Sequence, residues 1–435
     1  MKKNLNHILI NNSNKNFILS LQILLIVFVA FINSGFTQVY PEAYLNNAIE
    51  NNPGLKAKLE AYEAELQEKH LASALPDPTL TAGIFTPPMK RLMGNQWFDI
   101  GVMQMFPWFG TLNEQKSAAQ LMAQRSYHEY RNERNILFME ITSLWLKIYQ
   151  KDQQILLIEQ FEKVLKARED LIYSRYESGQ ANSGLSLDIY RLEIQISQLK
   201  NRKEKLNEEK ISLIRSFNLL IGRDEMAKVE MPQSLPTIGS GEINETQGVT
   251  DFNDNPKLNI AQSMAETAKV QQNINKLKTR PMMGIGLQYS YFAEGDPVMS
   301  QMDGGHMIMP MISVSLPIYR NKNQATIKKA MFAANAAEYK KNDQLNMLQI
   351  DYARLESSLN NLQRDYDFYT NQLEIIYKTW DLVLARYAGG EEGFDELLRI
   401  QDQLLEIEWR ILETKVNQHI KLAESDLLQA KNIFK

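Results

Sequence analysis

The sequence predicts a mostly α fold with a small β part, in which long helical hairpins alternate with short β-hairpins. The distribution of proline is the first observation behind this prediction, because all fourteen prolines lie in three ranges, 41–107, 232–256 and 281–317. Residues 108–231 and 318–435 contain none, and a helix interior tolerates proline least of all residues. The second observation is that short runs inside the proline-bearing ranges alternate apolar with small or polar residues, as strands do.

Residues 1–37 are expected to be a cleaved signal peptide. They hold three lysines and no acidic residue, and small residues follow an apolar run at 17–32. This run is shorter than the roughly 20 residues that a membrane-spanning helix needs, so an uncleaved anchor is the weaker alternative. Cleavage is predicted before Gln38, which would make the mature protein an exported one.

Composition excludes several classes of protein. The chain has 435 residues, of which 44% are hydrophobic and 23% charged, so it can bury a large core. It has no cysteine, which excludes disulfides, thiolate metal sites, a catalytic thiol and a lipid-anchored N-terminal cysteine. The net charge is −4 and becomes more negative once the N-terminal lysines are removed, which argues against a nucleic-acid partner.

Residues 38–240 are predicted to form a first structural repeat. An N-terminal helix is followed by two alternating runs separated by a turn, which predicts a β-hairpin at about 79–106. The proline-free stretch that comes next is predicted to be a helical hairpin at 111–222. Gly179 and Gly184 mark its tip, because clustered glycines end a helix and allow the chain to reverse.

Residues 241–435 are predicted to repeat the same order of elements. A helix precedes a β-hairpin at about 282–316, whose strands alternate apolar and aromatic residues with glycine and serine. A helical hairpin at 321–434 follows, and Gly389 and Gly390 mark its tip. An isolated pair of β-hairpins is barely stable in water, whereas strands with one apolar and one small-or-polar face suit a membrane barrel.

The outgoing helix of each helical hairpin is predicted to be about 100 Å long, at 1.5 Å per residue. Its apolar residues recur every seven positions, which predicts coiled-coil packing of helix against helix. An ordinary amphipathic helix would explain the apolar stripe but not the length. The second outgoing helix carries two rows: Leu355, Leu362, Tyr369, Ile376 and Val383, and Leu359, Tyr366, Leu373, Trp380 and Tyr387.

The two halves of the chain are a duplication. The segment "NNPGL" at 51–55 aligns with "DNPKL" at 254–258, and Pro107 in "FPWF" aligns with Pro317 in "LPIY". Ordered matches with a nearly constant offset indicate one structural unit used twice.

With this duplicated order, the sequence resembles the TolC-type outer-membrane efflux family. The resemblance covers the mature chain, through "AYLNNAIENNPGL", "ALPDPTL", "MQMFPWFGTL", "RYESG", "SLPIY" and "RYAGG". It implies a homotrimer in which each chain gives four strands to a 12-stranded β-barrel and its helices to a periplasmic α-barrel. Two of these segments, "ALPDPTL" and "QMFPWFGTL", favour the heavy-metal efflux branch.

The resemblance also implies a function. The protein would be the outer-membrane exit duct of a tripartite efflux system, embedded in outer-membrane lipid and extending into the periplasm. It would passively conduct metal ions or small toxic molecules from an inner-membrane pump and a periplasmic adaptor, or membrane fusion protein. No enzymatic activity and no cofactor are expected, and the alternative function is an exported periplasmic coiled-coil scaffold or adaptor without a channel.

Several residues are predicted to matter for such a duct. Pro107 and Pro317 are expected at the joints between strand and helix. Proline fits there because it has no backbone N–H that would need a hydrogen-bond partner. By the resemblance, Asp395 matches the aspartate that lines the periplasmic entrance, Asp188 is its counterpart in the first half, and Glu396 is its neighbour. The alternative role for these acids is an interaction with the helix N-terminus.

A loop rich in methionine separates the two strands of the second hairpin. Met299, Met302, His306 and Met307 are weak candidates for binding a soft ion such as Cu(I), which prefers thioether and imidazole ligands. The alternative is that Met307, Met309 and Met311 are ordinary strand side chains and that the rest belong to an external loop. The histidines share no metal-ligand spacing, and the sequence has no recognisable catalytic motif.

Overall fold

The computed structural model describes residues 41–177, 183–238, 251–294, 304–389 and 394–430. The expected signal peptide lies outside these ranges. Among the helices formed by the described residues, none combines the length and the apolar character needed to cross a membrane.

Two long helices organise the chain. Helix α4 (Thr111–Glu177) has 67 residues and helix α8 (Arg320–Gly389) has 70, so each is about 100 Å long at 1.5 Å per residue. The returning helices are shorter: α5 covers Ser183–Leu220 and α9 covers Phe394–Leu428. Both long helices fall where the sequence lacks proline, as expected from the cost of proline inside a helix.

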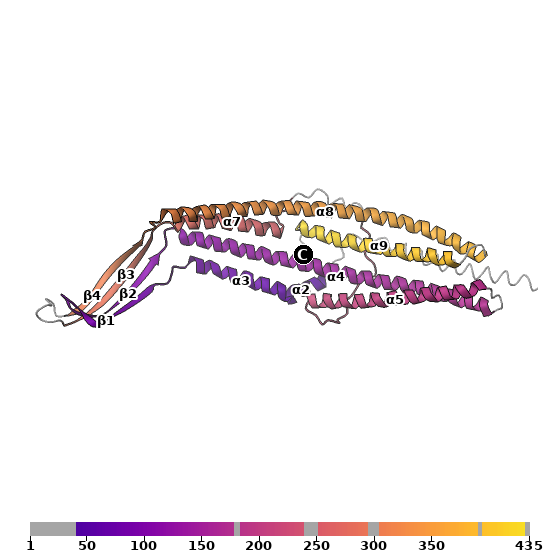
Figure 1. The fold of residues 1–435 in the computed structure, drawn as a ribbon, viewed down its shortest axis with the longest axis horizontal. Helices are drawn as coiled ribbons and strands as arrows, with labels where there is room; N and C mark the ends of the chain where they lie inside the picture. Colours follow the sequence, from indigo (N-terminus) through magenta and orange to yellow (C-terminus); the bar gives the residue numbers. More distant parts are fainter. Residues whose placement is uncertain (1–40, 178–182, 239–250, 295–303, 390–393, 431–435) are drawn as a thin grey trace, which may run out of the picture. The chain divides into compact units, whose positions relative to one another are not determined.

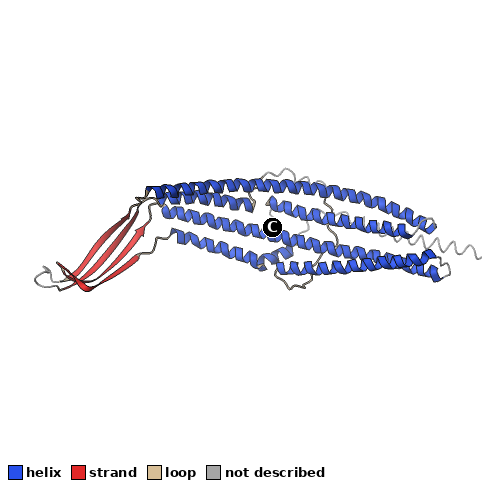
Figure 2. Ribbon diagram, viewed as in Figure 1, coloured by secondary structure: helices blue, strands red, loops and turns tan. Residues whose placement is uncertain are grey.

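The long helices pack lengthwise against their neighbours (Figures 1 and 2). Helix α4 contacts α3 (Pro53–Ser73), α5, α7 (Pro256–Leu277) and α9, whereas α8 contacts α7 and α9. None of the ten apolar residues in the two heptad rows of α8 is exposed, and Leu359 is 1% exposed. The seven-residue pattern therefore marks the buried side of α8.

Shorter helices precede each β-hairpin, and the helix next to the hairpin begins in the same way in both halves. Helix α2 (Glu42–Asn51) ends just before α3 (Pro53–Ser73), and α7 (Pro256–Leu277) opens the second half. Asn52 and Asn255 cap α3 and α7, each accepting a hydrogen bond from a backbone N–H at 2.9 Å.

The same two asparagines also join the ends of each half. The Asn52 side chain donates to the carbonyl of Leu220 (2.9 Å), where α5 ends. The Asn255 side chain donates to the carbonyl of Leu428 (3.1 Å), where α9 ends. Each half therefore fastens its returning helix to the helix before its β-hairpin with an equivalent contact.

Four antiparallel strands form one sheet in the order β1-β2-β3-β4 (Figure 2). They are β1 (Thr79–Arg91), β2 (Gly94–Phe106), β3 (Met282–Ala293) and β4 (Gly305–Ser315). The pairing of β2 with β3 joins the two hairpins, which are far apart in sequence. Neither β1 nor β4 has a strand partner on its outer side among the described residues.

The four strands have between 11 and 13 residues each. Strand β1 has 13 residues and includes Pro87 and Pro88, which lie within the change of register between Ile84 and Met89. An edge strand tolerates proline, since the missing N–H can face away from the ladder.

The segment at 223–238 connects the first half to the second and lies against the helices. The indole N–H of Trp145 in α4 donates to the carbonyl of Glu230 (3.1 Å). The His419 ring in α9 hydrogen-bonds to the carbonyl of Pro236 (3.0 Å) through Nε2, and burial lowers the pKa of this histidine. These contacts hold the connection on α4 and α9.

Candidate functional site

One face of the sheet exposes large apolar side chains, and we call it the apolar face. Strand pairing puts cross-strand partners on the same face, as in the row Leu80, Val102 and Leu287. Ile312 is 83% exposed and Ile84 is 78% exposed. An apolar patch of this extent marks contact with a membrane or another protein. Its exposed branched aliphatic members are Leu80, Ile84, Ile100, Val102, Ile285, Leu287, Ile308, Ile312 and Val314.

The opposite face, which we call the small-residue face, carries glycine, serine, threonine, glutamine and methionine. Here the Gln288 side chain donates to a carboxylate oxygen of Asp99 on the neighbouring strand (2.7 Å). The Gln96 side chain donates to the hydroxyl of Ser290 (3.4 Å), and both residues are buried. A sheet with one apolar and one polar face has the two-sided pattern of a membrane barrel strand.

Four aromatic rings gather on the apolar face, near the loop between β3 and β4. The hydroxyl of Tyr289 lies 2.6 Å from Nδ1 of His306. Phe98 and Tyr291 stack with ring centroids 5.6 Å apart. Rings with an apolar body and a polar end favour the boundary between lipid and water, so this cluster is typical of one rim of a membrane barrel.

Of the predicted soft-ion residues, the structure describes His306 and Met307, and these two do not come together. His306 and Met307 are consecutive in β4, so strand alternation places their side chains on opposite faces. Met299 and Met302 lie outside the described residues. No group of three or more His, Cys, Asp or Glu side chains within the described ranges could hold a metal ion.

The strand-to-helix joints contain the two expected prolines. Pro107 follows the last residue of β2 and precedes α4, where the N–H of Thr111 donates to the carbonyl of Trp108 (3.0 Å). Pro317 lies between β4 and α8, and its carbonyl accepts a hydrogen bond from the side chain of Asn323 (3.0 Å). Both prolines lie where a strand ladder ends and a helix has not yet begun.

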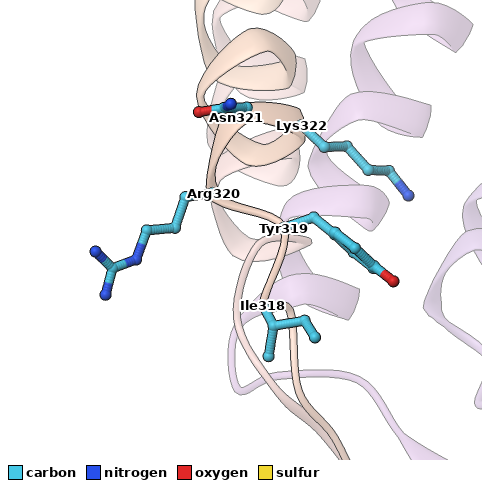
Figure 3. Close-up of a pocket in the computed structure, with 5 residues that line it drawn as sticks. All are labelled: Ile318, Tyr319, Arg320, Asn321 and Lys322. Atoms are coloured by element: carbon cyan, nitrogen blue, oxygen red, sulfur yellow. The ribbon is translucent and has the colours of Figure 1, made fainter.

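The second joint contains an open surface hollow, lined by the consecutive residues 318–322 (Figure 3). Ile318 and Tyr319 are both largely exposed. The Arg320 side chain projects to one side, whereas Tyr319 and Lys322 project to the other. An exposed tyrosine beside basic side chains next to an apolar sheet suits contact with lipid headgroups.

The helical tips bring the two predicted aspartates close together. Asp188 lies in α5 and Asp395 is the second residue of α9. Arg191, which the sequence analysis did not single out, lies 2.7 Å from a carboxylate oxygen of Asp395 and 3.6 Å from one of Asp188. Only the spacing of Asp188 and Arg191, three residues apart on a helix, could have suggested part of this contact.

The two aspartates differ in exposure. The Asp188 side chain is 19% exposed and that of Asp395 is 61% exposed. Burial raises the pKa of Asp188, the positive charge of Arg191 opposes this, and the negative charge of Asp395 adds to the rise. Of the two carboxylates that lie near Arg191, that of Asp395 is therefore the more exposed to solvent.

The third predicted acid, Glu396, has a partner of its own. Arg399 holds it with two hydrogen bonds, one of them 2.8 Å long, and this contact lowers the pKa of Glu396. Among the glycines expected at the tips, Gly184 is the second residue of α5 and Gly389 is the last residue of α8. Gly179 and Gly390 lie outside the described residues.

Comparison with known proteins adds the class of fold. No protein-family model matches the chain, and no curated protein matches its sequence. Solved structures do match. The outer membrane protein VceC of Vibrio cholerae superposes with a TM-score of 0.71 at 14% identity, over 89% of this chain and 95% of VceC.

Two further solved structures are described as outer membrane channels. MtrE of Neisseria gonorrhoeae matches with a TM-score of 0.69 at 18% identity, over 89% of this chain and 88% of MtrE. CmeC of Campylobacter jejuni matches with a TM-score of 0.69 at 12% identity, over 91% of this chain and 88% of CmeC.

The chain therefore has the fold of outer-membrane channels. The TolC-type fold expected from the sequence, mostly α with a small antiparallel sheet, is confirmed.

Proposed function

We propose that three copies of this chain form a duct in the outer membrane that passively conducts small substrates out of the periplasm. The observation that carries the proposal is the sheet with one exposed apolar face and one small-residue face. In a closed barrel the apolar face would contact lipid and the small-residue face would line the lumen. Metal ions and small toxic molecules are the substrates that the resemblance to TolC-type proteins favours.

The free edges of the sheet support a trimer. A four-stranded sheet cannot close on itself, and β1 and β4 have no partner on their outer sides among the described residues. Three sheets joined β4 to β1 would give the twelve strands of one barrel and leave no edge.

The helices offer matching support. Apolar side chains on α8 are exposed in the single chain, among them Tyr339 (74%) and Phe332 (64%). Tyr190 and Ile194 on α5 are exposed as well. In a trimer, neighbouring copies would pack against the outer sides of α8 and α5 and would cover these exposed side chains. A scaffold of single chains would leave the same side chains in water.

The helical tips are the proposed entrance. In a trimer, Asp395 and Asp188 would each occur three times around the axis, and rings of carboxylates favour cations. Arg191 links the two aspartates within one chain and would hold α5 against α9 while the entrance is closed. A periplasmic adaptor and an inner-membrane pump are the proposed partners at this end.

Thiol labelling tests the membrane assignment directly. The chain has no cysteine, so single cysteines can be introduced without background. Ile312→Cys and Ser313→Cys are adjacent in β4 and lie on opposite faces. In intact outer membranes, a small charged thiol reagent should label Ser313→Cys from the lumen and leave Ile312→Cys unlabelled.

Detergent-solubilised, denatured protein is the control, in which both cysteines must react. Equal labelling of both variants in intact membranes would overturn the barrel and favour a periplasmic scaffold or adaptor without a channel.

A further inference from the structure

Helix α8 lacks a neighbour that its counterpart α4 has. The helices nearest the sheet follow one another in the order α3-α4-α7-α8 (Figure 1). Helix α4 packs against the short helix of its own half, α3, and against the short helix of the other half, α7. Helix α8 packs against α7 of its own half, but the described residues show no extended contact between α8 and α3. By the duplication, the missing neighbour of α8 is α3 of a second copy.

Aligning the two halves shows which side of α8 is left uncovered. The match of "RYESG" with "RYAGG" pairs residues of α4 and α8 that are buried in both helices, so the two helices keep the same register. Three such pairs are Ala119 with Ala330, Ala123 with Ala334, and Leu137 with Leu348. The same match pairs Ala118, which is 3% exposed, with Lys329, which is exposed. Lys329 therefore lies on a side of α8 whose counterpart on α4 is covered.

The short helices show the complementary difference. The match of "NNPGL" with "DNPKL" pairs Leu71 of α3 with Ile274 of α7, and Glu68 with Gln271. Ile274 is 2% exposed, whereas Leu71 is 67% exposed. Ile274 and Gln271 line a surface hollow together with Ala118 of α4. The counterparts of these two residues on α3 therefore lie on a side that no helix of the same chain covers.

The two uncovered sides carry opposite charges at matching positions. Exchanging each residue of the α4–α7 contact for its counterpart brings Glu68 and Leu71 of a second copy against Lys329. Helix α4 follows β2 and α7 precedes β3, so the two helices are antiparallel, and α8 and α3 of a second copy would be antiparallel as well. About three turns further from the sheet, Lys340 on α8 is therefore level with Glu60 on α3.

The four charged side chains are free to make this contact. Lys329, Lys340, Glu60 and Glu68 are all exposed, and none has an ion-pair partner among the described residues. Contact between two α8 helices would bring lysines together, and contact between two α3 helices would bring glutamates together. Like charges disfavour both, so the charges select contact of α8 with α3.

We propose that the half of α8 nearer the sheet packs against α3 of the next copy, with Lys329 paired to Glu68 and Lys340 paired to Glu60. Such a contact joins two different surfaces, so repeating it closes a ring. The inference rests on the proposed trimer and deepens it, because it names the charges that set the order of the copies. That order, α8 to α3, is the order in which β4 would meet β1.

Cross-linking tests the contact in the full-length protein. Glu68→Cys with Lys329→Cys introduces two thiols into a chain that has none. A short bifunctional maleimide should then join the copies, and boiled SDS gels should show covalent dimers and trimers. Links within one chain are excluded, because α4 and α7 separate α3 from α8.

The two single-cysteine variants are the matched controls. In Glu68→Cys or Lys329→Cys alone, each thiol would face a side chain that cannot react, so boiled samples should contain monomers only. Monomers only in the double variant, from protein that migrates as a trimer before boiling, would overturn the contact.

Charge reversal tests the two ion pairs. Lys329→Glu with Lys340→Glu should lower the temperature at which the trimer dissociates in SDS by about 5 °C, and less at high salt. Adding Glu60→Lys and Glu68→Lys restores opposite charges and should recover most of the loss. No loss in the first variant, or a loss that the second pair of substitutions fails to recover, would overturn the ion pairs.

Failure of this inference is separable from failure of the proposed function. If planar bilayers record a channel but the double-cysteine variant does not cross-link, the contact is wrong and the duct stands. If the variant cross-links between copies but Ile312→Cys is labelled in intact membranes, the contact stands and the duct is wrong.

Discussion

Arg191 is the residue through which the two tip aspartates interact within one chain. The guanidinium of Arg191 lies closer to Asp395 than to Asp188, although Asp188 shares α5 with Arg191 and Asp395 lies in α9. The Arg191–Asp395 pair is partly exposed, so its contribution to the stability of the fold is small. Its position between α5 and α9 matters more, because it links the helices that would move apart when the entrance opens.

Asp395→Asn should reduce the cation preference of the channel. If Asp395 forms a ring of three carboxylates, the substitution removes three charges from a narrow entrance, and the ratio of K⁺ to Cl⁻ permeability in planar bilayers should fall about twofold. Asp381→Asn, an exposed site on α8, is the control. Unchanged selectivity with an intact trimer would leave Asp395 as an acid that serves only the helix N-terminus.

Glu408→Gln should make the stability of the helical part less sensitive to a rise in pH above the acidic range. Burial raises the pKa of Glu408, which accepts a hydrogen bond from the hydroxyl of Tyr377 (2.9 Å). An acid whose pKa is raised in the folded state contributes stability at low pH, and this contribution is lost as pH rises through the folded-state pKa. The apparent unfolding midpoint of Glu408→Gln, followed by circular dichroism, should therefore rise relative to the wild type as the pH rises above about 4.3, the ordinary pKa of glutamate.

The control for this substitution is Glu63→Gln, an exposed site on α3. Tyr377→Phe should lower the midpoint by removing a hydrogen bond worth about 1 kcal/mol. A difference between Glu408→Gln and the wild type that does not change with pH would contradict the buried-charge explanation.

A positive charge introduced into β3 should have different effects on its two faces. Leu287→Arg places a guanidinium on the apolar face near the middle of the strand, at a cost of about 2–4 kcal/mol per chain in lipid. Gln288→Arg places it on the small-residue face beside Asp99. The yield of folded protein in the outer membrane should fall sharply for the first variant and little for the second, and equal yields would argue against lipid contact.

Elements with one dominant local cause were predictable from the sequence. The absence of proline and glycine predicted α4. The alternation of apolar with small or polar residues from Met283 to Tyr291 predicted most of β3. The contact of Arg191 with Asp395 was not predictable, because it depends on how α5 and α9 align in space. The approach of the Met105 sulfur to Gly284 depends in the same way on the register of β2 and β3, which no local pattern specifies.

At the scale of the whole molecule, the single chain leaves apolar surface uncovered on the sheet and on α8. Three copies would cover the helical part, and lipid would cover the apolar face. The protein extracted from outer membranes in SDS without heating should therefore migrate as a trimer and should become a monomer after boiling. A monomer before heating, in protein whose helical content is intact, would contradict the assembly.

The order of the strands also bears on how a newly made chain avoids aggregation. Before assembly, β1 and β4 present free backbone groups that any other strand could pair with. These are also the strands that contain proline: Pro87 and Pro88 in β1, and Pro310 in β4, whereas β2 and β3 have none. Proline interrupts a ladder because it has no N–H to donate, so pairing with a wrong partner is less stable along both edges. The same prolines would lie at the seams between subunits, where correct pairing then depends on matching side chains as well as on the backbone.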